Sequence, residues 1–379
     1  MSTSTHMQSL VCPGDHTVEL REKPIPQPGP EDVRIRIQAS AVCGSDLHKY
    51  RQSAEERATH GYDQLTLGHE GAGIVDAVGP GVLHPKIGDR VVAYHLIGCG
   101  ACEYCRAGEP GFCRDIEGFN WVRDGVNAEY VVIPARYALP LPDDFDFEEG
   151  ALFACNVGTA YGAARKAGAS GDMTLAVSGL GPVGLYTVMM ARAMGAPVIG
   201  VDVQSSRIEL AKSMGIDMTV NPTESDAVAA MRDFGGGDGV HASIDTSGNT
   251  QARSAAIDAL RPHGRFVEVG LGHETVYALS TPLNMREITL TGSWIFKLYE
   301  WEDLLDFVRR HKLPIKSVIS HRFPIQDAAD AFGLAEAGTA GKLLFTWPAV
   351  TALAIRPQLI YHTSTAESSG DMPWLLLHL

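Results

Sequence analysis

The stretch "MTLAVSGLGPVGLYTVMMARAMGAPVIGVDV", residues 173–203, decides the fold of this chain. A short apolar run at 173–179 leads through a glycine-rich turn into a predicted helix from Pro182 to Met194. A second apolar run follows at 197–203. This order predicts two parallel strands that are joined by a crossover helix, because parallel strands need such a connection.

The glycine turn within this stretch has the spacing G-x-G-x-x-G. Glycines allow the tight turn and let backbone amides approach a pyrophosphate at the N-terminus of the following helix. The turn residues predicted to bind a dinucleotide are Gly179, Gly181, Pro182, Val183 and Gly184.

An acidic residue at the end of the second run tests this interpretation. Asp202 ends "VIGVD", 23 residues after Gly179. A carboxylate there accepts the ribose hydroxyls and repels a 2′-phosphate, which favours NAD over NADP. The alternative is that Asp202 is only a solvated strand end. Arg207 either lies along the same ribose or adenine or is a surface residue of the helix predicted at 205–215.

The same alternation continues beyond this unit. Apolar runs at 240–248 and 265–270 flank a predicted helix at 251–260, and another run follows at 288–294. Repeated strand–helix units predict a parallel sheet with helices on both faces.

The first half of the chain has a different pattern. The segment 32–42, "DVRIRIQASAV", alternates apolar and polar residues, and 71–82 and 88–96 are further predicted strands between glycine turns. This spacing predicts a β-barrel-like domain. Short mixed elements return after the predicted helix at 300–311 and continue to Phe345, whereas 349–379 has no sustained period.

Composition excludes several classes of protein. The net charge of −14 argues against nucleic-acid binding, which needs clustered Lys and Arg. No apolar run is long enough to span a bilayer, and the first ten residues lack the pattern of a secretory signal, so we expect a cytoplasmic protein without membrane contact. Seven cysteines, an odd number, also fit a reducing compartment.

Four of these cysteines lie in "CGACEYCRAGEPGFC", residues 99–113. Short C-x-x-C steps let thiolates converge on one tetrahedral ion, and four thiolates leave no open position. The cluster therefore predicts a structural Zn²⁺, with unligated buried thiols as the alternative. Its ligands would be Cys99, Cys102, Cys105 and Cys113.

A second, sparser set of metal-ligating residues remains. Cys43, His69 and Cys155 together offer two thiolates and one imidazole, and a catalytic zinc uses three protein ligands with a fourth position open. Each residue taken alone has an ordinary explanation as a packed core residue. Cys12 is left without an assignment.

The chain resembles the zinc-containing medium-chain dehydrogenase family of alcohol and polyol dehydrogenases. The motifs "CGSDLH", "GHEGAGIV", "CGACEYCRAGEPGFC", "GLGPVGL" and "VIGVD" occur in the family's order, over roughly residues 8–347. The resemblance implies an α/β fold with a GroES-like, β-rich zinc catalytic domain at 1–155 and 297–348. This domain is split by a Rossmann NAD-binding domain at 156–296, and an atypical tail follows at 349–379.

The resemblance also implies roles for single residues. Cys43, His69 and Cys155 match catalytic-zinc ligands, and the clustered cysteines match the structural-zinc lobe. The other matches are Glu70 beside the metal, Asp46 as a carboxylate near the ligands, Ser45 and His48 as a proton relay, and Thr159 on the nicotinamide.

The implied activity is reversible oxidation of a secondary alcohol or polyol by hydride transfer to NAD, with two zinc ions per chain. Alternatives are an amino-alcohol, a primary alcohol or an aldehyde as the substrate, or a catalytically silent binding protein of the same fold. The resemblance further implies a tetramer or dimer. Residues expected to line the substrate pocket are Tyr50, Phe119, Trp294, Phe296 and Lys297.

Overall fold

The computed structural model describes residues 5–272 and 280–347. The tail predicted at 349–379 lies outside the described residues.

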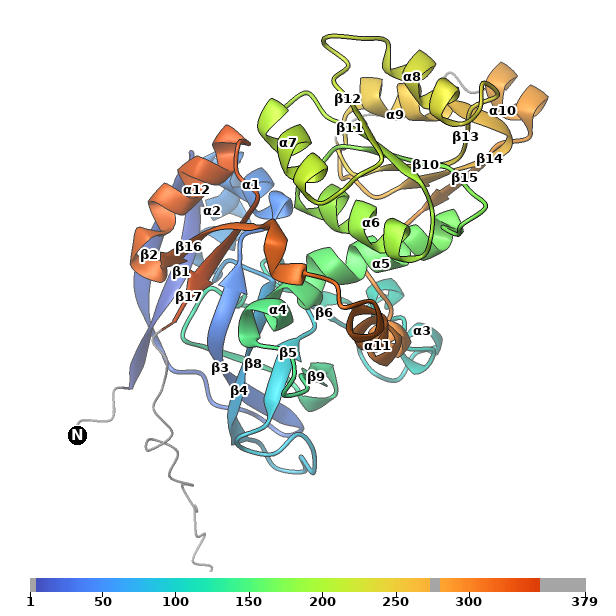
Figure 1. Ribbon diagram of the computed structural model, residues 1–379. Coiled ribbons are helices and arrows are strands. Elements are labelled where there is room, and N and C mark those ends of the chain that lie inside the picture. Colours follow the sequence, from blue (N-terminus) through green and yellow to red (C-terminus); the bar gives the residue numbers. More distant parts are fainter. Residues whose placement is uncertain (1–4, 273–279, 348–379) are drawn as a thin grey trace, which may run out of the picture. The chain divides into compact units, whose positions relative to one another are not determined.

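A six-stranded parallel sheet in the described residues confirms the α/β unit predicted from residues 173–203. The strand order is β12-β11-β10-β13-β14-β15, which reverses direction beside β10, where the glycine turn begins. The strands, shown in Figure 1, are β10 Leu175–Ser178, β11 Val198–Val201, β12 Met218–Val220, β13 Val240–Asp245, β14 Leu260–Glu268 and β15 Thr289–Gly292.

Helices pack on both faces of this sheet. Successive residues of β10 point to opposite faces. Val177 joins the core that includes Leu185 of α6, whereas Ala176 joins the core that includes Met231 of α8. The helices are α6 Pro182–Ala193, α7 Ser205–Ser213, α8 Ala227–Phe234, α9 Thr250–Asp258 and α10 Ser280–Arg286.

The β-rich part predicted from the first half is a sheet of order β16-β17-β3-β4-β5-β9, with β8 also paired to β3, within the described residues. Its neighbours are antiparallel except for β16 and β17. The strands are β3 Asp32–Ala41, β4 Glu70–Val78, β5 Arg90–Ala93, β8 Tyr130–Pro134, β9 Ala138–Pro140, β16 Ile319–Pro324 and β17 Lys342–Thr346. Two smaller pairs are β1 His6–Gly14 with β2 Thr17–Pro24, and β6 Leu96–Ile97 with β7 Glu117–Gly118.

Helices that the strand-rich interpretation overlooked accompany this sheet. They are α1 Gly44–Arg51, α2 Ala54–Thr59, α3 Glu103–Arg106, α4 Phe147–Leu152 and α12 Ala328–Ala337. The helix α5 Gly158–Ala167 contacts β13 and β14 of the parallel sheet instead. The helix predicted at 300–311 is α11 Trp301–His311.

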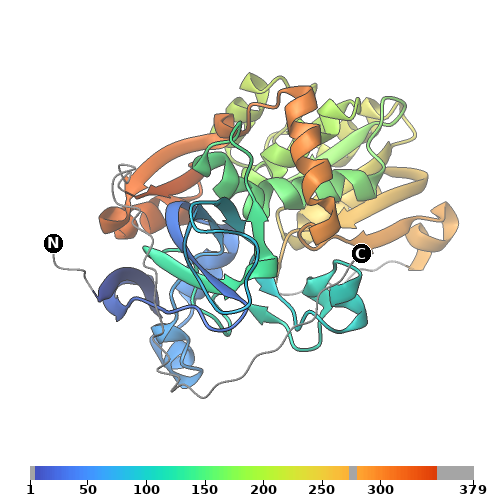
Figure 2. The same ribbon diagram turned by 90° about the horizontal axis from the view of Figure 1, so that it is seen from below.

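The connection between the two parts of the chain is helical. A π-helical turn, Phe153–Val157, joins α4 to α5 without a break, and the domain boundary predicted at 155/156 falls inside this turn. Tyr161 of α5 contacts Phe307 of α11, with ring centroids 5.4 Å apart. Figure 2 shows α11, in orange, across the green segment that holds α5.

We expect Gly184→Ala to destabilise the protein even without cofactor. A Cβ at Gly184 would lie 1.8 Å from the carbonyl oxygen of Gly179, so strand and helix would have to separate, at a cost of roughly 1–3 kcal/mol or more. The measurement is thermal unfolding of the apoprotein. Gly181→Ala is the matched control, because a Cβ there would meet only Arg207 at 4.0 Å. Equal stability of both variants would contradict this account of the turn.

Candidate active site

Four metal-ligating side chains from separate segments converge at one place. They are Cys43, His69, Glu70 and Cys155, and one ligand atom of each lies within 4.8 Å of the others. His69, Glu70 and Cys155 are buried, and Cys43 is half-buried. The structure therefore brings together the three residues that the sequence predicted as catalytic ligands.

Local structure explains why these residues meet. Ala41 at the end of β3 pairs with Glu70 at the start of β4, so Cys43 and His69 lie just beyond adjacent strand ends. Cys155 lies in the π-helical turn, a wider helical form that occurs often at functional sites.

Asp46 holds both neighbouring ligands in place. It is fully buried, and its Oδ2 accepts a hydrogen bond of 2.9 Å from the backbone N–H of Cys43. Its Oδ1 lies 3.3 Å from Nδ1 of His69, which leaves Nε2 of that ring for a metal. Asn120 donates to the same oxygen over 3.3 Å. Such outer partners orient metal-binding imidazoles.

The metal-ligating side chains strongly perturb one another's pKa values. A hydrogen bond from Cys155 and the charge of His69 lower the pKa of Cys43 well below its ordinary value, despite burial. The same contact, together with burial, raises the pKa of Cys155. Burial alone would lower the pKa of His69, but Asp46 and Cys43 raise it to about 10. Soft thiolates with one imidazole form a donor set that zinc accepts, so the residues fit this ion.

Glu70 has two partners that the sequence did not reveal. Asn156 donates to its Oε1 over 2.5 Å, and Nζ of Lys342 donates to the same oxygen over 2.8 Å. Burial would lower the pKa of Lys342, but Glu70 and Cys43 raise it above its ordinary value. Lys342 is therefore a buried cation beside the candidate metal site.

His95 is another residue that sequence interpretation missed. Its ring meets that of His69 edge-on, with centroids 4.9 Å apart, and burial lowers its pKa to about 3. A neutral imidazole therefore borders the site.

Of the predicted relay and nicotinamide residues, Thr159 contacts one of the metal-ligating side chains. Ser45 and His48 are three residues apart on α1, which places them on neighbouring positions of one helix face. Thr159 is buried on α5, with its hydroxyl 4.0 Å from the sulfur of Cys155.

The glycine turn has the features of a dinucleotide site. Gly179 has a φ of +89°, and α6 begins with Pro182 directly after Gly181. Asp202 accepts hydrogen bonds from the backbone of Leu180 and Gln204, over 2.6 and 2.8 Å, so its carboxylate is fixed at the turn.

Arg207 lies beside this carboxylate, with Nη1 3.6 Å from Oδ2 of Asp202. The role of Arg207 beside the ribose or adenine stays a prediction. The open glycine turn, the helix N-terminus and the carboxylate together fit a nicotinamide dinucleotide.

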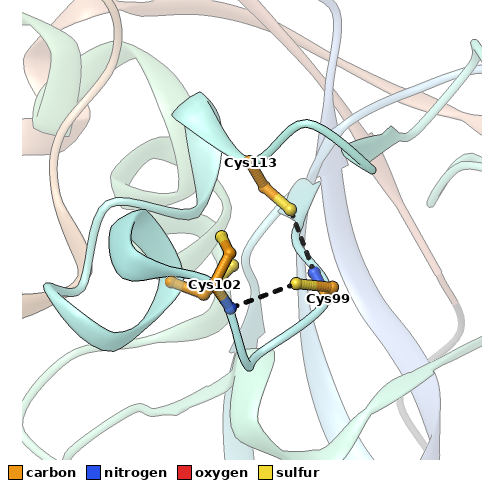
Figure 3. A group of neighbouring side chains, drawn as sticks. Cys99, Cys102 and Cys113 are labelled. Atoms are coloured by element: carbon orange, nitrogen blue, oxygen red, sulfur yellow. Dashed lines mark hydrogen bonds between the residues drawn. The ribbon is translucent and has the colours of Figure 1, made fainter.

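The clustered cysteines form a separate group, which also fits a metal ion. The backbone N–H of Cys102 donates to the sulfur of Cys99 over 3.4 Å, and that of Cys99 donates to the sulfur of Cys113 over 3.3 Å (Figure 3). Amides of Ala101 and Cys102 lower the pKa of Cys99 to about 6. In the described part of the chain, the seven cysteines form no disulfide, and Cys12 belongs to neither group.

The residues predicted to line a substrate pocket each have an aromatic or backbone partner in the structure. Tyr50 packs on Phe332, with ring centroids 5.3 Å apart. Trp294 stacks on Trp121, and the ammonium of Lys297 lies 3.9 Å from the ring centroid of Phe112.

Two other predicted pocket residues contact His95 and its neighbour Tyr94. The backbone N–H of Phe119 donates to the carbonyl of His95 over 3.2 Å. Phe296 is fully buried, and its carbonyl accepts a hydrogen bond of 2.8 Å from the hydroxyl of Tyr94.

Comparison with known proteins assigns the family. A model of the alcohol dehydrogenase GroES-like domain matches residues 29–143, and a model of zinc-binding dehydrogenases matches residues 182–310. The chain is 35% identical to the uncharacterized zinc-type alcohol dehydrogenase-like protein YphC of Escherichia coli (strain K12), over 90% of this chain and 99% of that protein. The chain therefore belongs to the zinc-binding alcohol dehydrogenase family, with a GroES-like domain and a Rossmann-like sheet.

Other relatives act on different alcohols. An L-threonine 3-dehydrogenase of Anaeromyxobacter sp. (strain Fw109-5) is 34% identical, over 86% of this chain and 95% of that protein. An L-idonate 5-dehydrogenase of Vitis vinifera is 33% identical, over 88% of this chain and 92% of that protein.

Solved structures with the same fold extend the comparison. An alcohol dehydrogenase from E. coli CFT073 in complex with NADH has a TM-score of 0.82 and 25% identity, and covers 91% of this chain and all of its own. Galactitol-1-phosphate dehydrogenase from Escherichia coli has a TM-score of 0.80 and 29% identity, with 90% and 100% covered. Among the described residues of this chain, no helix has the length and apolar character to cross a membrane.

We expect Cys99→Ala to lower stability first and activity with it, because the four-cysteine group closes a lobe that has little other core. The zinc content should fall from about two ions to about one per chain, and the thermal midpoint should fall with it. Arg114→Ala is the control, since this exposed residue directly follows Cys113. A Cys99 variant with unchanged midpoint and metal content would contradict the structural-zinc assignment.

Proposed function

We propose that this protein is a dehydrogenase that oxidises a secondary alcohol or a polyol hydroxyl to a carbonyl, reversibly, with NAD as the hydride acceptor. The observation that carries the proposal is the convergence of Cys43, His69 and Cys155 in one site, together with Asp202 at the glycine turn. A catalytically silent protein would have no need to keep both sets of residues.

The cofactors supply the reactive chemistry. Cys43, His69 and Cys155 would hold zinc as a Lewis acid that makes a hydroxyl more acidic, and the glycine turn would hold NAD as the hydride acceptor. The second group of cysteines would hold a structural zinc, because four thiolates leave no position for a substrate.

The residues of the chain orient the proposed zinc ligands and remove the proton from the substrate hydroxyl. Asp46 fixes the orientation of His69 through Nδ1 and the position of Cys43 through its amide. Ser45 is the hydroxyl that receives the proton from the substrate, and His48 passes it to solvent, since an imidazole exchanges protons near neutral pH. Thr159 packs against the nicotinamide beside Cys155.

The dinucleotide site favours NAD over NADP. The carboxylate of Asp202 is held at the turn by two backbone amides, so it cannot swing away from a 2′-phosphate. Such a carboxylate accepts ribose hydroxyls and repels a phosphate.

The substrate class rests on the relatives. The L-idonate enzyme is named for a sugar acid, and the galactitol-1-phosphate enzyme is named for a sugar-alcohol phosphate. Both compounds carry several hydroxyls, which supports a polyhydroxylated substrate. The L-threonine enzyme supports an amino-alcohol as the second candidate. Cytoplasmic location, the oligomeric state and the domain boundaries stay predictions.

A substrate screen tests the proposal. Zinc-replete protein is incubated with NAD⁺ or NADP⁺ and with polyols, amino-alcohols or primary alcohols, and reduced nicotinamide is followed by absorbance. We expect the fastest reduction with NAD⁺ and a polyol or secondary alcohol. Preference for L-threonine would select the amino-alcohol candidate, and no reduction with any substrate would refute the dehydrogenase proposal.

His69→Ala should abolish turnover while the fold is retained, because it removes one of three proposed zinc ligands. The measurements are the rate of NADH formation and the circular dichroism spectrum of the same sample. Cys12→Ala is the control, since it removes a buried thiol that belongs to neither metal-ligating group. Wild-type turnover of the His69 variant would show that the catalytic-zinc assignment is wrong.

A further inference from the structure

Lys342 is a charged residue in the interior of the β-rich domain. Its side chain is 1% exposed, and Nζ donates a hydrogen bond of 2.7 Å to the carbonyl of Val42, the residue before Cys43. Nζ also lies 2.8 Å from Oε1 and 2.7 Å from Oε2 of Glu70. A buried ammonium is stable only with such partners, so these contacts fix the position of Lys342.

The register of the sheet places Lys342 next to Glu70 and Val42. On β17, Leu344 pairs with Ala41 of β3, and Ala41 pairs with Glu70 of β4. The start of β17, the end of β3 and the start of β4 therefore lie side by side. The last strand of the sheet thus brings a cation to the metal-ligating residues.

Glu70 competes for the position that a substrate needs. One of its oxygens lies within 4.8 Å of the ligand atoms of Cys43, His69 and Cys155. Zinc is tetrahedral in most protein sites, so a fourth protein ligand would close it. Asn156 and Lys342 both hold Oε1, whereas Oε2 has no hydrogen bond from any described residue. Only the ion pair with Lys342 therefore restrains Oε2.

We propose that Lys342 is a positioning residue that keeps Glu70 out of the zinc coordination shell and so keeps the fourth position open for substrate. The inference rests on the catalytic-zinc assignment of the proposed function. Without the cation, the negative carboxylate has zinc as its nearest positive partner and becomes a fourth ligand. The metal then has four protein ligands and no open coordination position, as expected for the four-cysteine group.

Cobalt spectroscopy tests this inference independently of turnover. Co²⁺ replaces zinc in the purified full-length protein, and imidazole is added as a small exogenous ligand while the visible d–d bands are recorded. The four-cysteine group has no open position, so the change caused by imidazole reports on the catalytic site alone. We expect the bands of the wild-type protein to shift.

The variants separate a positioning role from a structural one. Lys342→Gln and Lys342→Met should both lose the imidazole-induced shift of the cobalt bands. The two neutral variants are measured in parallel, so that either one that folds gives the result. Lys342→Arg should keep it, because the charge is retained. The double variant Lys342→Met with Glu70→Gln should regain it, because an amide is a poor zinc ligand and the competing carboxylate is gone.

Each outcome decides between the proposals. A shift in the neutral single variants equal to that of the wild type would overturn the role of Lys342 and leave the dehydrogenase proposal intact. Loss of the shift that the Glu70→Gln change does not reverse would also overturn it, because the defect would then be structural. A wild-type protein whose cobalt bands do not respond to imidazole would instead refute the open catalytic site itself.

Discussion

Burial of charge at the candidate metal site is the constraint on which the rest of the structure depends. Thiolates, an imidazole and a carboxylate lie within a few ångströms of one another, away from water. Each buried ion costs several kcal/mol unless it is paired and hydrogen-bonded. Asp46 supports His69, and Lys342 and Asn156 support Glu70. A zinc ion held here would supply the remaining counter-charge for the two sulfurs. Removal of Lys342 would leave the charge of Glu70 without its cationic partner.

Features formed by residues close together in the sequence were predicted, whereas contacts between residues far apart in the sequence were not. The glycine turn with Asp202 and the four clustered cysteines are local motifs, and their physical requirements can be recognised within about thirty residues. The contacts of Asn120 with Asp46, Asn156 with Glu70 and Lys342 with Glu70 span 74, 86 and 272 positions. No local periodicity encodes contacts of this kind, because strand order and register create them.

Backbone geometry was the other feature beyond the reach of the sequence pattern. The residue type of Cys155 predicts a metal ligand, but the π-helical turn that holds it has no signature in the segment 153–157. The same turn places Asn156 beside Glu70, so one local widening of a helix sets two contacts of the site. The strand-rich interpretation of the first half overlooked this helical connection, since short helices between strands carry little periodicity.

The position of Lys342 links the metal site to the topology of the whole chain. The contact between Lys342 and Val42 joins residues 300 positions apart, so the site is complete only when β17 has docked on β3. The entropic cost of closing a loop grows slowly with its length, by about 0.6 kcal/mol for each doubling. When the segment between the two ends is itself folded, its own contacts hold these ends together and lower the cost further. The ends here are α5 and α11, which Tyr161 and Phe307 join through their rings and Arg165 and Glu300 through an ion pair of 3.3 Å. These contacts bring together the two ends of the chain segment that forms the parallel sheet.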